Sequence, residues 1–86
     1  MIDILRKLTD AVSVSGAEEP VADVIRGLIS DCADEIKSDA LGNLIAVKKS
    51  GKADAKKIMM AAHMDEIGFV VTFIEDSGFI KVAPVG

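Results

Sequence analysis

The chain's only histidine, His63, stands in a short polar cluster with Asp65 and Glu66. A neutral imidazole is a good ligand for zinc or cobalt through one ring nitrogen, and a carboxylate near the other nitrogen fixes the tautomer and makes the ligand more basic. In an extended backbone residues i and i+2 lie on the same side, so His63 and Asp65 can point together. The spacing suits one metal ligand and its orienting partner. Taken alone it favours a plainer interpretation, a strand-end histidine hydrogen-bonded to an aspartate, with Glu66 in solvent.

The run before the histidine, residues 58–62, predicts the strand that would position it. Five apolar residues without polar alternation are typical of a strand covered on both faces. Glycines at 51 and 68 leave little room for a helix of usual length. We therefore expect His63 at the carboxyl end of a buried strand, where ligands and catalytic groups collect in open α/β sheets.

Two amphipathic helices are expected before this strand, over residues 2–12 and 17–33, because apolar residues recur there at steps of three and four. The second helix should begin near 17–19, because Pro20 is tolerated only in a first turn. Between the helices, residues 13–16 form a turn-prone run. Cys32 falls on the apolar stripe of the second helix, which predicts a small core residue.

The remaining pattern predicts strands and turns. Short strands are expected over 34–39 and 44–49, and a solvated loop over 50–56. Residues 68–74 and 79–85 are apolar runs on either side of a strong turn signal, which predicts a β-hairpin. The fold class is therefore α/β: two N-terminal helices packed on a mixed β-sheet with a C-terminal hairpin, with a core that is unfinished and belongs to a larger domain.

Composition excludes several classes of partner. The net charge is −4 and the chain has no Trp or Tyr and three Phe, so no surface for stacking bases along a phosphate backbone is expected, and nucleic acid is not a partner. Nothing approaches 18 uninterrupted apolar residues, and the first residues lack the apolar core of a signal peptide, so no membrane association is expected. A single cysteine is compatible with a reducing cytoplasm, the expected location.

Four segments carry a family resemblance: VSVSGAEEPV at 12–21, DALGNLIAVKKSG at 39–51, IMMAAHMDEIGFVV at 58–71 and DSGFIKVAPVG at 76–86. Together they resemble the start of the tetrahedral aminopeptidases. This family of two-metal exopeptidases includes glutamyl and deblocking aminopeptidases, and some members have been labelled endoglucanases.

The resemblance implies that residues 1–86 are the N-terminal part of a metallo-aminopeptidase catalytic domain, truncated near the start of an inserted β-rich domain. It implies two divalent ions, zinc or cobalt, and it matches His63 to the first metal ligand and Asp65 to the catalytic aspartate that orients that site. The other ligands and the general base follow later in the family, so these 86 residues alone should be inactive. Peptides would be the substrates, and the complete protein would form a homo-oligomer, a dodecamer in the family.

Two other functions stay open at this point. The chain could be an autonomous, non-catalytic binding module that uses its apolar hairpin as a binding edge. A polysaccharide hydrolase, following the endoglucanase label, is disfavoured because glycosidases need two carboxylates across a sugar, and the polar cluster is centred on a histidine.

Overall fold

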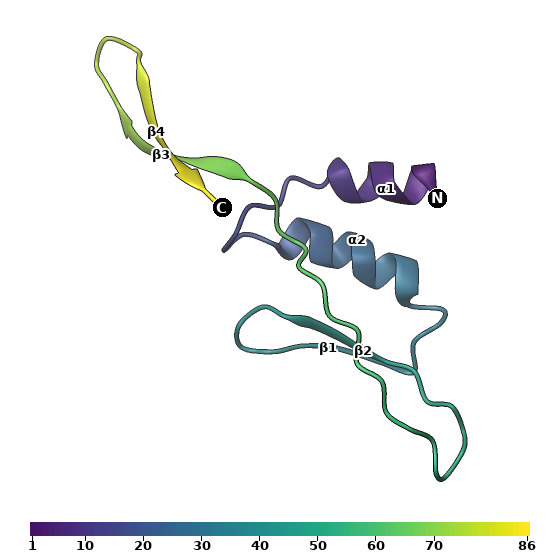
Figure 1. Cartoon of the computed structure of the whole chain (residues 1–86). Helices are drawn as coiled ribbons and strands as arrows, with labels where there is room; N and C mark the ends of the chain where they lie inside the picture. Colours follow the sequence, from purple (N-terminus) through teal and green to yellow (C-terminus); the bar gives the residue numbers. More distant parts are fainter.

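The computed structural model describes all 86 residues, Met1–Gly86, as two helices and two small antiparallel sheets (Figure 1). The elements are α1 (Ile2–Thr9), α2 (Glu19–Ile29), β1 (Glu35–Ser38), β2 (Leu44–Val47), β3 (Gly68–Ile74) and β4 (Ile80–Val85). The predicted α/β class is confirmed. The strands form two separate pairs, however, in place of one mixed sheet.

Both helices are present, and both end earlier than the sequence predicts. In α1 the Thr9 hydroxyl donates to the carbonyls of Leu5 and Arg6, a local bond of the kind that competes with further helix. Helix α2 begins at Glu19, inside the predicted window, with Pro20 in its first turn. It ends at Ile29, where the backbone N–H groups of Cys32 and Ala33 both donate to the Ile29 carbonyl.

The early end of α2 makes the prediction for Cys32 wrong. Cys32 lies in the turn after the helix and is exposed. Because Cys32 is not part of the helix, it does not lie on the apolar face of α2. Its thiol donates to the Ile29 carbonyl at 3.2 Å.

The four remaining predicted strands form two antiparallel hairpins, and the C-terminal one is the hairpin that the sequence predicts. Strand β1 pairs with β2 from Glu35↔Val47 to Ser38↔Leu44, across a short turn in which Gly42 has φ +85°. Strand β3 pairs with β4 from Gly68↔Val85 to Ile74↔Ile80, with an irregularity between Val71 and Phe73.

The prediction of a buried strand over 58–62 is wrong for this chain. The segment is extended and runs past α2 between the two hairpins, but no backbone hydrogen bond joins residues 58–62 to any other residue (Figure 1). Ile58, Met59 and Met60 are 87%, 89% and 93% exposed. A strand needs a neighbouring strand for its N–H and C=O groups, and each hairpin is a sheet of two strands to which residues 58–62 do not pair.

The molecule is elongated, and its core is very small. Only Ser13, Val21 and Ala22 are buried, where residues 13–14 meet the start of α2. The accessible surface is 7478 Å², against about 4,850 Å² for a compact monomer of this mass. The extents are 66 × 29 × 15 Å, and the hairpin β3–β4 projects away from the helices (Figure 1). Neither helix is long and apolar enough to cross a membrane.

Candidate functional site

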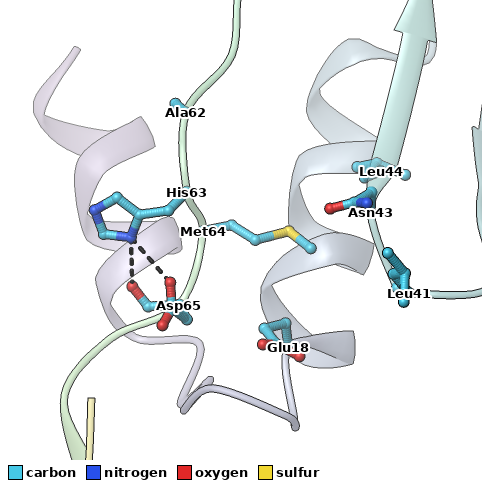
Figure 2. Close-up of a pocket in the computed structure, with 9 residues that line it drawn as sticks. Glu18, Leu41, Asn43, Leu44, Ala62, His63, Met64 and Asp65 are labelled. Atoms are coloured by element: carbon cyan, nitrogen blue, oxygen red, sulfur yellow. Dashed lines mark hydrogen bonds and ion pairs between the residues drawn. The ribbon is translucent and has the colours of Figure 1, made fainter.

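His63 and Asp65 lie in the extended segment that leads into β3, and their side chains are on the same side of it, as the sequence predicts. His63 Nδ1 lies 3.0 Å from Asp65 Oδ1 and 3.1 Å from the Asp65 backbone oxygen. Met64 leaves the chain on the opposite side, toward Asn43 and Leu44 (Figure 2). The alternation places the imidazole beside its own carboxylate partner and keeps the thioether away from it.

These contacts decide which nitrogen of the neutral imidazole is free. Both groups that face Nδ1 are acceptors, a carboxylate oxygen and a carbonyl oxygen, so Nδ1 carries the proton. The lone pair of the neutral ring is then on Nε2. Because the His63 side chain is 85% exposed, Nε2 is accessible to a ligand. This is the tautomer that a metal-binding histidine adopts when a carboxylate orients it.

An open groove borders this pair, between the start of α2 and the β1–β2 turn. It is lined by Glu18, Leu41, Gly42, Asn43, Leu44, Ala62, His63, Met64 and Asp65. The Glu18 carboxylate is engaged elsewhere, because it accepts a hydrogen bond from the Gly16 N–H at 2.7 Å.

The turn that forms one wall of the groove is held by a single carboxylate. Asp39 accepts from the backbone N–H groups of Leu41 and Asn43, each at 2.9 Å, and from the Asn43 side-chain amide at 2.8 Å. The Asn43 side-chain hydrogen bond, followed by its backbone bond, holds the pKa of Asp39 below its ordinary value, although the residue is exposed.

The donor set fits one coordination position of a zinc or cobalt ion and no more. His63 Nε2 is a suitable nitrogen ligand, but no group of three or more His, Cys, Asp or Glu side chains comes together in the chain. Catalytic zinc normally has three protein ligands. The residues of this chain therefore do not make a metal site by themselves.

Two residues near the site, Ser13 and Glu66, make hydrogen bonds that the sequence does not predict. Ser13 is 1% exposed, and its hydroxyl oxygen accepts from the Val21 N–H at 3.0 Å. Glu66, expected in solvent, is exposed but its carboxylate accepts from the Ser13 N–H at 3.2 Å. Ser13 stands eight residues before its helical partner, well outside the usual capping interval, so no spacing rule points to it.

Comparison with known proteins identifies the family. The profile of the M42 glutamyl aminopeptidases matches residues 42–86, just over half of the chain, and includes the His63–Asp65 segment. The chain belongs to the M42 glutamyl aminopeptidase family. The resemblance inferred from the four segments is confirmed.

The individual relatives of the chain are about four times as long as it is. A provisionally named aminopeptidase of Acetivibrio thermocellus is 58% identical over all 86 residues, which are 25% of its length. An aminopeptidase from the archaeon Desulfurococcus kamchatkensis has the same backbone arrangement, with a TM-score of 0.90 and 42% identity, over 99% of this chain and 23% of that one.

A second similar structure bears a different name. The crystal structure of an endoglucanase from Thermotoga maritima matches with a TM-score of 0.86 and 44% identity, over 95% of this chain and 26% of that one. The chain thus spans about a quarter of the length of each of these three relatives.

Proposed function

We propose that the chain is the N-terminal part of a metal-dependent aminopeptidase, residues 1–86 of its catalytic domain, ending near the start of an inserted β-rich domain. Within it, His63 is a ligand of one of two divalent ions, zinc or cobalt, and Asp65 is the catalytic aspartate that orients the ligand. The observation that carries this proposal is the pair of contacts at His63 Nδ1, which leave an exposed Nε2 lone pair. Membership of the M42 family supplies the reaction class.

The bound ions would supply Lewis acidity and a more acidic water for hydrolysis of the peptide bond after the first residue of a peptide. This chain's own part is narrower: it offers one imidazole nitrogen and fixes its tautomer. Since three ligands are usual and this chain offers one, the 86 residues alone are inactive under this proposal. The complete protein would act on peptides in the cytoplasm as a homo-oligomer.

The test is His63→Ala in the complete polypeptide that carries this chain. Removing the ligand should abolish metal-dependent release of N-terminal residues from peptides and lower the zinc content of the purified protein. Asp65→Ala should weaken zinc binding by roughly 10- to 100-fold, because the ring loses its orienting carboxylate but keeps the backbone acceptor.

Lys52→Ala, in the exposed loop between β2 and the site, is the matched control and should behave as wild type. Full activity in His63→Ala would refute the assignment. The intact mass of the natural gene product is a separate check, since a polypeptide of M42 length is required.

The polysaccharide-hydrolase alternative is disfavoured by the geometry. Both carboxylates of the polar cluster are already engaged, Asp65 with His63 and Glu66 with Ser13. A glycosidase needs two carboxyl groups facing each other across a sugar. These residues therefore contain no pair of free carboxylates of the kind that a glycosidase would need.

The autonomous binding module is disfavoured by the surface area. A module of 86 residues that folds alone should bury a core, whereas this chain buries two apolar side chains and exposes Phe69, Phe73 and Phe79 by more than half. Such a surface belongs to an element of a larger core.

A further inference from the structure

The peptide unit between Asp65 and Glu66 is held on both of its polar sides. Its carbonyl oxygen, that of Asp65, faces His63 Nδ1 at 3.1 Å. Its N–H, that of Glu66, donates to the Ser13 carbonyl at 2.9 Å. A peptide unit is planar and trans, so the direction of its N–H fixes the direction of its carbonyl. The position of Ser13 therefore determines where one of the two acceptors of the imidazole points.

Ser13 is itself fixed by three hydrogen bonds. Its carbonyl accepts from Glu66, its N–H donates to Glu66 Oε1 at 3.2 Å, and its hydroxyl oxygen accepts from the Val21 N–H in the first turn of α2. It is the only buried polar residue of the chain. The parallel bridge between Val14 and Glu66 continues the same contact. We call the two Ser13–Glu66 hydrogen bonds and the Val21–Ser13 hydrogen bond the Ser13–Glu66 clasp.

We propose that Ser13 and Glu66 are positioning residues for His63: through the clasp they tie the Asp65–Glu66 peptide to the start of α2 and so hold the imidazole with Nδ1 protonated and Nε2 free. The proposal rests on the proposed function, because it concerns the ligand assigned there. Partners that orient a metal-binding histidine typically change metal affinity by about 10- to 100-fold when they are removed. An effect of that size is expected here, although neither residue touches the ring.

Glu66 has a competing role that the proposal must exclude, since a carboxylate three residues from His63 could itself be a ligand or a general base. The Glu66 carboxylate accepts from the Ser13 N–H, and no hydrogen bond joins it to His63 or Asp65. An acceptor for an N–H does not need a negative charge, whereas a ligand or a base does. Glu66→Gln keeps the oxygen acceptor and removes the charge, so it separates the two roles.

The experiment compares Glu66→Gln, Glu66→Ala and Ser13→Ala in the complete polypeptide, with Glu35→Ala in β1 as the matched control. Three quantities are measured: the dissociation constant for zinc alone, by competition with a chelator; the ¹⁵N shifts of the His63 ring, which report the tautomer; and hydrogen exchange at the Glu66 amide. Values of kcat and KM for a peptide substrate are added.

Glu66→Ala and Ser13→Ala should weaken zinc binding by about 10- to 100-fold, mix the two ring tautomers and speed exchange at the Glu66 amide. The loss of activity should fall on kcat, with KM nearly unchanged. Glu66→Gln should bind zinc within a few-fold of the wild-type affinity and keep the wild-type ring tautomer and amide exchange. Glu35→Ala should be indistinguishable from wild type in all of these measurements.

Two results would overturn the proposal. In one, Glu66→Gln loses as much zinc affinity as Glu66→Ala, which would make the charge essential. In the other, Glu66→Ala keeps wild-type affinity and a single tautomer. If Ser13→Ala fails to fold, the comparison of Glu66→Gln with Glu66→Ala still tests the proposal. A wild-type protein that does not cleave peptides, or an active His63→Ala variant, would reject the proposed function, whereas the ring tautomer and amide exchange would still test the clasp.

Discussion

At the residue scale, the site depends on which atoms face one imidazole nitrogen. The period of two along an extended chain is enough to bring Asp65 beside His63, and the sequence shows it directly. The backbone acceptor, by contrast, depends on a peptide whose direction is set from Ser13, 53 residues away from Glu66. Contacts between residues so far apart leave no spacing pattern in a single sequence. The His63–Asp65 pair could therefore be predicted from the sequence, whereas the hydrogen bonds between Ser13 and Glu66 could not.

Gly68 gives a residue-scale prediction, because it lies against Val14 where the chain returns past the segment that joins the two helices. A Cβ on Gly68 would overlap Val14 Cγ1 and would lie 3.4 Å from Val14 Cβ. Gly68→Ala should therefore destabilise the complete polypeptide by about 1–3 kcal/mol, the usual cost of overpacking. Chemical denaturation followed by circular dichroism measures the change.

The control for this prediction is built into the chain. Val14→Ala combined with Gly68→Ala should recover most of the loss, since the overlapping methyl group is gone. Gly27→Ala, in the interior of α2 with nothing within 4 Å, should instead stabilise by about 0.5–1 kcal/mol. Equal destabilisation of the single and double variants would show that the Val14 contact is not the cause.

At the element scale, local patterns predicted most of the fold. Helix α2 begins where Pro20 requires, and both hairpins form around turn-prone residues. Two of the errors concern segments that lack a packing partner. Residues 58–62 have the composition of a buried strand but no neighbouring strand, and Cys32 lies past the end of its helix with nothing to cover it. Composition indicates that a segment suits burial, but not which segment covers it.

The β1–β2 turn should respond to acid through Asp39. Because the hydrogen bond from the Asn43 side chain lowers the pKa of Asp39 below 3.8, the ionised carboxylate stabilises the turn at all pH values above the ordinary pKa. This stabilisation should be lost as the pH falls through the lowered pKa. Titrating the Asp39 carboxyl by NMR should give a midpoint below 3.8, with faster exchange of the Leu41 amide on the acid side.

Asn43→Ala removes the largest cause of the shift and should raise the pKa of Asp39 toward its ordinary value. An unchanged Asp39 midpoint in that variant would contradict the assignment of the side-chain amide as the cause.

At the scale of the whole molecule, the chain has the surface of an incomplete structure. Its radius of gyration is 17.6 Å, against about 12 Å for a compact domain of 86 residues. Its accessible surface exceeds that of a compact monomer by about half. Together with matches that cover about a quarter of the two relatives' lengths, these values support the proposal that the chain is part of a larger domain.

The chain expressed alone should accordingly lack a cooperative thermal transition, because two buried apolar side chains cannot offset the conformational entropy of 86 ordered residues. Differential scanning calorimetry and sedimentation velocity measure this directly. A sharp, reversible transition of a monomer that does not respond to zinc would instead support the autonomous module.

The unpaired run at 58–62 also affects the tendency of the newly synthesised polypeptide to aggregate before it has folded. Five uncharged residues with free backbone groups on both edges form a template to which like segments could add, as in fibrils. Lys56 and Lys57 precede the run, and Asp65 and Glu66 follow it closely. Stacked copies in register would bring these like charges together, so we expect the lysines and carboxylates on either side of the run to oppose aggregation as well.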